Sequence, residues 1–219
     1  MRQGSARVPA TVSVVIPGPV GALEAVVDST GEIPAAVAAI CHPDPQAQGT
    51  MHNKVVTTLA RAFTQLGAAA VRFNYRGVGS SAGSQTDGVG EIEDALAVVD
   101  WCRTRWRDSP LYLGGFSFGA AIAIAIAARV APRGLVTVAP PVDRLPADLD
   151  PPSCPWVLVH GDADDIVAPE PVLALATALA APPKIVLLSG VGHFFHGRLP
   201  ALAQAVHETF GADFSPTQG

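Results

Sequence analysis

Charged residues are scarce in this sequence: only 15% of its 219 residues are Asp, Glu, Lys or Arg, and the formal net charge is −5. No basic stripe is present, so nucleic acid is not expected as a partner. The 49% of hydrophobic residues can form a sizeable core and excludes a disordered chain. We predict a single domain over residues 1–211, followed by a flexible tail over residues 212–219.

Cysteine is also rare. The three cysteines, Cys41, Cys102 and Cys154, are odd in number and far apart, which excludes a disulfide framework and the usual spacing of metal ligands. They are expected to be small buried thiols in the reducing cytoplasm. Neither a metal nor a cofactor is expected.

Long apolar runs are absent as well. No segment has the length and hydropathy needed to cross a bilayer, and residues 1–10 lack the apolar region of a signal peptide. We therefore expect a cytoplasmic protein with no membrane partner.

The chain does contain a series of short apolar runs, which are typical of buried strands, and several of them are separated by helical patterns. This alternation predicts a mostly parallel eight-stranded sheet with helices on both faces. Strands are expected at residues 12–16, 22–27, 35–41, 69–73, 111–113, 135–138, 156–160 and 185–188, and helices at residues 53–66 and 91–106. The first two strands flank a Pro-Gly-Pro turn and are expected to pair in the antiparallel direction.

One of these strands, residues 111–113, leads into Gly115-Phe-Ser-Phe-Gly119, a match to the G-x-S-x-G pattern. In a nucleophile elbow this pattern places the Ser on a sharp turn between a strand and a helix. The following isoleucines alternate with alanines, as in a strand, but the strong helix propensity of Ala predicts a buried helix instead. A pattern with only three fixed positions occurs often by chance. The interpretation of Ser117 as a nucleophile therefore depends on finding a base and an acid elsewhere in the chain.

Candidate partners follow two later strands. The loop over residues 161–167 carries three aspartates, and the loop over residues 189–196 carries two histidines. Either loop alone is ambiguous, because aspartates in loops usually lie in solvated turns and a single histidine is usually structural. The order Ser, Asp, His, with each residue after a strand end, is the order of the α/β-hydrolase triad and predicts nucleophilic catalysis.

The chain resembles the α/β-hydrolase family over nearly its whole length, and in particular small bacterial serine hydrolases without a cap domain. The likeness includes the His-Pro-x-Pro loop at residues 42–45 and the Asn-Tyr-Arg-Gly-Val-Gly-Ser-Ser stretch at residues 74–81. This resemblance implies that Asp164, in Gly-x-x-Asp, is the acid and that His193 is the base.

The same resemblance leaves other polar residues of the two loops without a catalytic role. Asp162 and Asp165 are expected to be bystanders, and His196 is expected to lie at the surface or to support the site. The chain departs from the family pattern at Asp44, where His is common, and at Gln48, where Gly is expected. These departures concern the substrate side of the loop, and the substrate-binding residues are not predicted.

The oxyanion hole of such an enzyme needs two backbone N–H donors, one after the nucleophile and one in the loop after the third strand. The first is Phe118. In the second loop Pro43 and Pro45 have no N–H, so between them only Asp44 can donate. Its carboxylate must then point away from the oxyanion, whereas reshaping the turn would lower turnover.

The connection over residues 139–153 is short and rich in proline, too short for a cap domain. An open site argues against a triacylglycerol lipase and favours short acyl chains. Arg72 or Arg76 could neutralise an anionic substrate, although the simpler interpretation of Arg76 is that it stabilises its own loop.

Together these features predict a serine hydrolase that cleaves small carboxylic esters, or thioesters, through an acyl-enzyme intermediate. The alternatives are a binding protein of the same fold without activity, and an acyltransferase, perhydrolase or peptidase with the same triad. The oligomeric state is not predicted.

Overall fold

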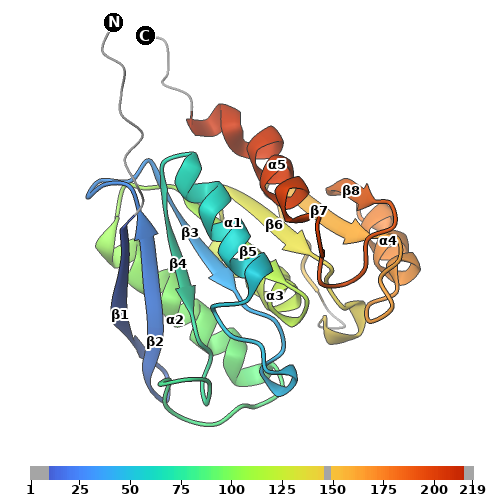
Figure 1. The fold of residues 1–219 in the computed structure, drawn as a ribbon. Coiled ribbons are helices and arrows are strands. Elements are labelled where there is room, and N and C mark those ends of the chain that lie inside the picture. The colour runs from blue at the N-terminus through green and yellow to red at the C-terminus, as the bar shows by residue number, and fades with distance from the viewer. Residues whose placement is uncertain (1–9, 146–148, 215–219) are drawn as a thin grey trace, which may run out of the picture.

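A computed structural model describes residues 10–145 and 149–214. Eight strands form one sheet in the order β1-β2-β4-β3-β5-β6-β7-β8 (Figure 1). β2 is antiparallel to its neighbours β1 and β4, and every other pair is parallel. The strands are β1 (Ala10–Gly18), β2 (Gly21–Ser29), β3 (Ala36–Cys41), β4 (Ala68–Phe73), β5 (Leu111–Phe116), β6 (Gly134–Val138), β7 (Trp156–Gly161) and β8 (Lys184–Leu188).

Helices cover both faces of this sheet. They are α1 (Lys54–Gln65), α2 (Val89–Arg105), α3 (Phe118–Val130), α4 (Pro169–Ala178) and α5 (Leu199–Phe210), with 3-10 helices η1 (Pro45–Ala47), η2 (Val142–Arg144) and η3 (Gly211–Phe214). Residues of α1 and α5 share one hydrophobic cluster with the sheet, and residues of α2, α3 and α4 share the other. Figure 1 shows α1 and α5 in front of the sheet and α2 behind it. The predicted α/β-hydrolase fold is therefore confirmed.

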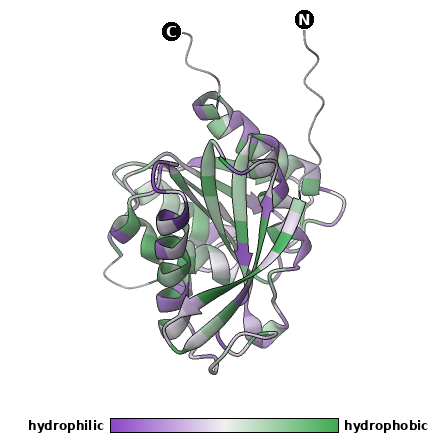
Figure 2. Cartoon of the chain, turned by 90° about the vertical axis from the view of Figure 1, so that its left-hand side faces the viewer, coloured by the Kyte–Doolittle hydropathy of each residue, from purple (hydrophilic) through white to green (hydrophobic). Residues whose placement is uncertain are grey.

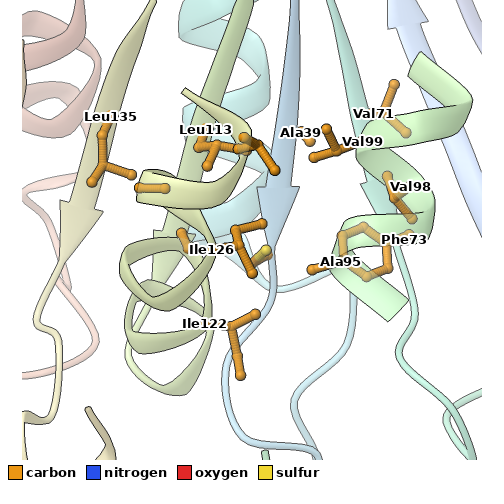
Figure 3. Packing of buried hydrophobic residues seen from close by; sticks show 14 of the residues in the cluster. Ala39, Val71, Phe73, Ala95, Val98, Val99, Leu113, Ile122, Ile126 and Leu135 are labelled. Atoms are coloured by element: carbon orange, nitrogen blue, oxygen red, sulfur yellow. The ribbon is translucent and has the colours of Figure 1, made fainter. Parts of the chain in front are cut away.

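The alternation of side chains along a strand explains the two clusters. In β5, Leu111 and Leu113 pack in the cluster under α2 and α3, whereas Tyr112 and Phe116 pack in the cluster under α1 and α5. Figure 3 shows part of the first cluster, and Figure 2 shows hydrophobic segments in the strands and both hydrophobic and hydrophilic segments in the helices. Burial of apolar surface on both faces fixes the position of each strand end, and the site lies at these ends.

The predicted elements agree with the structure, with differences at their ends. β1 and β2 do pair in the antiparallel direction but are longer than predicted, and β5 continues to Phe116, up to the elbow. The alanine-rich segment after the elbow is the helix α3, as predicted.

The C-terminal boundary differs from the prediction. Residues 212–214, assigned to a flexible tail, form part of η3. Asp213 accepts a hydrogen bond of 2.8 Å from the Tyr112 hydroxyl and one of 3.1 Å from Arg133. The ring of Phe214 stacks on Tyr112 with 5.4 Å between ring centroids, so these residues pack against the sheet. The remainder of the predicted tail lies outside the described residues.

The connection from β6 to β7 contains no cap domain. Among its described residues the only regular element is η2, and residues 146–148 lie outside the described part. Within residues 10–145 and 149–214, no helix has both the length and the apolar character that a membrane span requires.

Candidate active site

Ser117 lies at the junction of β5 and α3, in a backbone conformation that side chains rarely adopt, with φ 53° and ψ −123°. Such strain costs about 1–3 kcal/mol and is typical of functional sites. The two glycines of the motif are required by close packing. A Cβ at Gly115 would lie 2.2 Å from the carbonyl oxygen of Gly119, and a Cβ at Gly119 would lie 2.4 Å from the carbonyl oxygens of Cys41 and His42. The motif therefore builds the turn that presents Ser117.

The structure brings together the three residues predicted as a triad. Nε2 of His193 lies 3.1 Å from Oγ of Ser117, and Nδ1 of His193 lies 2.8 Å from Oδ2 of Asp164. The three residues follow β5, β7 and β8, whose carboxyl ends meet at one edge of the sheet (Figure 1). Asp164 and His193 are buried and Ser117 is partly exposed, as a nucleophile that must meet a substrate requires. Because a carboxylate only accepts, Nδ1 carries the hydrogen and Nε2 is free to accept the Ser117 proton.

Asp164 is held as a carboxylate. Burial raises its pKa, but hydrogen bonds from His193 and from the N–H groups of Val167 and Ile166 outweigh burial, so the net shift of the pKa is downward. Oδ1 accepts the two backbone bonds, at 2.8 and 3.0 Å, while Oδ2 faces His193. The loop thus orients the carboxylate and keeps it ionised.

A second histidine, His160, also contacts this carboxylate and was not predicted as a site residue. Its Nε2 lies 2.9 Å from the Val167 carbonyl oxygen and 3.5 Å from Oδ2 of Asp164. Desolvation lowers its pKa, which favours a neutral ring that donates to Val167. Its position at the end of β7, directly before Gly161, was the only signal in the sequence.

The two predicted oxyanion donors line the same pocket as Ser117. Among the described residues, neither the Phe118 N–H nor the Asp44 N–H has a hydrogen-bond acceptor. Oδ1 of Asp44 accepts the N–H of Gln46 at 2.8 Å, so the carboxylate is engaged by its own turn. Gln48, also at the pocket, has φ 62°, a left-handed conformation that favours glycine, the residue expected there from the resemblance.

The pocket around Ser117 has a volume of about 520 Å³. The carboxylates of Asp44 and Asp143 and the guanidinium of Arg144 line it. Arg144 forms an ion pair with Asp87, and the hydrogen bond to Asp87 raises the pKa of Arg144, with Asp44 and Asp143 adding to the shift. Arg144 is therefore influenced by three carboxylates, of which those of Asp44 and Asp143 line the pocket.

The two arginines considered for substrate binding are structural instead. Arg76 is buried and pairs with the buried carboxylate of Asp94 at 2.8 Å, as the simpler interpretation held. Arg72 pairs with Asp28 at 2.8 Å and donates to the Met51 carbonyl oxygen at 2.9 Å. Neither arginine is among the lining residues of the pocket.

The remaining polar residues of the two loops lie outside the hydrogen-bonded triad. Asp162 and Asp165 are exposed, and Asp162 accepts the N–H of Gly190 at 2.6 Å. His196 is exposed and accepts from Lys54 at 2.8 Å, so it lies at the surface.

The cysteines are free thiols: Cys41 and Cys102 are buried, whereas Cys154 is only partly buried. Within the described ranges, no group of three or more His, Cys, Asp or Glu side chains could hold a metal ion.

Comparisons with known proteins agree with the fold. Residues 48–152 match a family described as serine aminopeptidase, S33. XC6422 from Xanthomonas campestris, described as a member of the α/β serine hydrolases without a lid, is 38% identical, with a TM-score of 0.88 over 95% of this chain and 97% of that one. An α/β serine hydrolase homologue from Coxiella burnetii is 42% identical, with a TM-score of 0.85 over 90% of this chain and 96% of that one.

A shorter likeness is to the lysophosphatidylserine lipase ABHD12 of Gallus gallus. It is 39% identical over 85 residues, which are 39% of this chain and 22% of that protein.

Proposed function

The chain belongs to the α/β serine hydrolases, and we propose that it cleaves small, uncharged carboxylic esters through an acyl-enzyme on Ser117. The observation that carries this proposal is the hydrogen-bonded series from Ser117 through His193 to Asp164. A nucleophile, a base and an orienting acid in this arrangement are the parts that acyl transfer requires.

In the proposed mechanism, Oγ of Ser117 attacks the ester carbonyl carbon as its proton moves to Nε2 of His193. Asp164 stays ionised and stabilises the imidazolium. The oxygen of the tetrahedral intermediate accepts from the N–H groups of Phe118 and Asp44. Collapse breaks the bond to the alcohol oxygen, which takes the proton from His193. Water then attacks the acyl-enzyme by the same route and releases the acid.

The size and charge of the pocket support the substrate class. A volume of about 520 Å³ and the absence of a cap domain favour short acyl chains over long ones. The carboxylates of Asp44 and Asp143 line the pocket, and the guanidinium of Arg144 is already paired with Asp87, so an anionic substrate would be repelled. Thioesters fit the same geometry.

A second candidate is an aminopeptidase. The carboxylates at the pocket could hold a cationic substrate amino group, and the matched family carries the description serine aminopeptidase. The triad and the oxyanion hole would act in the same way on an amide, with His193 giving its proton to the leaving amine.

A panel of chromogenic substrates separates these functions. It comprises 4-nitrophenyl acetate, butyrate and octanoate, 4-nitrophenyl hemisuccinate as the anionic match to butyrate, a butyryl thioester and aminoacyl 4-nitroanilides. We expect the highest kcat/KM for acetate or butyrate and the loss of turnover in Ser117→Ala. Faster cleavage of anilides would favour the aminopeptidase, and no turnover of any substrate would favour a binding protein.

A further inference from the structure

His42 lies at the end of β3, fully buried beside the oxyanion loop, which we define as residues 43–51. Its Nδ1 lies 2.7 Å from the Pro43 carbonyl oxygen, and its Nε2 lies 3.2 Å from the backbone N of Tyr75. A carbonyl oxygen only accepts and a backbone N–H only donates. The two contacts therefore fix one tautomer, with the hydrogen on Nδ1 and a lone pair on Nε2.

The carbonyl that His42 contacts has a special place in the site. The Pro43 oxygen and the Asp44 nitrogen belong to one planar peptide group, so the direction of one bond sets the direction of the other. A hydrogen bond accepted by the carbonyl oxygen also polarises the peptide and makes its N–H a stronger donor. His42 thus connects the Tyr75 N–H to the Pro43–Asp44 peptide through two hydrogen bonds in series.

We propose that His42 is a positioning residue of the oxyanion hole, which orients and polarises the Asp44 N–H toward the developing negative charge. This inference rests on the proposed function. His42 does not line the pocket, so it acts through the peptide and not on the substrate.

The other end of the oxyanion loop, at Met51, is held by residues that lie close to Tyr75 in the sequence. Oδ1 of Asn74 accepts the Met51 N–H at 2.9 Å, and Arg72 donates to the Met51 carbonyl oxygen at 2.9 Å. Within the loop, the Gly49 N–H donates to the Asp44 carbonyl oxygen at 2.8 Å. Residues 72–75, at the end of β4, therefore hold both ends of the loop, which gives the start of the Asn-Tyr-Arg-Gly stretch a role.

Two substitutions at His42 separate positioning from packing. In His42→Asn the side-chain amide nitrogen can take the place of Nδ1 and still donate to Pro43. In His42→Gln the longer side chain reaches instead toward the place of Nε2 and fills more of the ring's volume. A packing role predicts that Gln is the better replacement, whereas a positioning role predicts Asn.

The experiment measures kcat and KM for 4-nitrophenyl butyrate, with active sites counted by a fluorophosphonate. We expect His42→Asn to retain kcat within about fivefold and His42→Gln to lose about 30- to 100-fold, with KM within about threefold for both, since one lost oxyanion donor costs about 10²–10³. The affinity for butylboronic acid, which places an oxygen in the hole, should fall in parallel with kcat. Equal or higher kcat in His42→Gln would overturn the proposal.

The wild-type protein supplies a second test in case neither variant folds. Nitrogen-15 NMR of the His42 ring should show the hydrogen on Nδ1, and a hydrogen on Nε2 would contradict the proposal. This measurement and boronate binding need no substrate turnover. Failure of the ester panel alone would therefore count against the proposed function and not against the position of His42.

Discussion

On one side of Ser117, the loops after β7 and β8 place an ionised carboxylate behind a histidine that can take up a proton. On the other side, the loop after β3 places backbone N–H groups, and its histidine is buried, neutral and fixed in one tautomer. Burial lowers the pKa of His42 to about 4. One residue type thus serves two purposes: His193 has a carboxylate partner and contacts the nucleophile, whereas His42 has only backbone partners and lies outside the pocket.

The largest expected effect comes from breaking the proton-transfer side. His193→Ala should lower kcat by roughly 10⁴- to 10⁶-fold, because Ser117 then has no base. Steady-state kinetics with 4-nitrophenyl butyrate measure this loss. His196→Ala, which changes an exposed histidine of the same loop, is the matched control and should stay near wild type. Comparable losses in the two variants would contradict the assignment of the base.

The second largest loss of kcat is expected at the orienting acid, Asp164. Asp164→Asn should lower kcat by roughly 10³- to 10⁴-fold, because an amide can donate to His193 and favour the wrong tautomer. Asp165→Asn alters the adjacent exposed carboxylate and should have little effect. If Asp165→Asn proved to be the damaging change, the acid would be the neighbouring residue.

Because His42 is buried and neutral, we expect the free energy of unfolding to depend on pH. Because the pKa of His42 is lowered to about 4, the unfolded state binds more protons between pH 6.5 and 4, and stability falls as the pH falls through this window. Nearby Glu91 favours the charged ring, but desolvation outweighs it. From the pKa of 6.5 for a free histidine, the loss between pH 7 and pH 5 is about 2 kcal/mol.

Urea unfolding at pH 7 and pH 5 measures this loss. We expect His42→Asn to show a smaller decrease in the free energy of unfolding than wild type, since it lacks the titrating ring. An equal decrease in the two proteins would show that His42 does not contribute.

A smaller effect is expected where the oxyanion loop is fastened to β4. Asn74→Ala removes the acceptor for the Met51 N–H and should lower kcat about tenfold, with KM within about threefold, because the Asp44 N–H is less well placed. The matched control, Tyr112→Phe, removes a hydrogen bond of 2.8 Å to Asp213 at the opposite end of β5. It should lower the melting temperature without lowering kcat. A loss of stability but not of kcat in Asn74→Ala would contradict the positioning role.

The smallest expected effect is at the donor residue itself. Asp44→Asn should leave kcat within about threefold of wild type, because the backbone N–H acts and the side chain is engaged by Gln46. The same variant should raise kcat/KM for 4-nitrophenyl hemisuccinate relative to butyrate, since it removes a negative charge from the pocket. A large fall in kcat for butyrate would show that the carboxylate takes part in the reaction.

The two sides of Ser117 also differ in how far the sequence could predict them. The triad residues follow short apolar strands in a recognisable order, so Ser117, Asp164 and His193 could be named. The alternation of short apolar runs with helical patterns predicted the sheet. The supports of the oxyanion loop could not be named, because they depend on the pairing of β3 with β4, which brings His42 next to Tyr75 and Met51 next to Asn74.

Other differences have similar causes. His160 contacts Val167 and Asp164 because the loop after β7 folds back over the end of that strand. No pattern of residue spacing in the sequence indicates such a contact. The ordering of residues 212–214 depends on Tyr112 and Arg133, both far away along the chain. Local propensity indicated a frayed end, and tertiary contacts override it.

The central claim is that Ser117 is a nucleophile activated by its neighbours, and covalent labelling tests it most directly. A fluorophosphonate should add once to the wild-type protein, and peptide mass spectrometry should locate the adduct on Ser117. His193→Ala should react far more slowly, and Ser117→Ala should not react at all. An adduct that persists in Ser117→Ala, or a wild-type protein that stays unlabelled, would contradict the account.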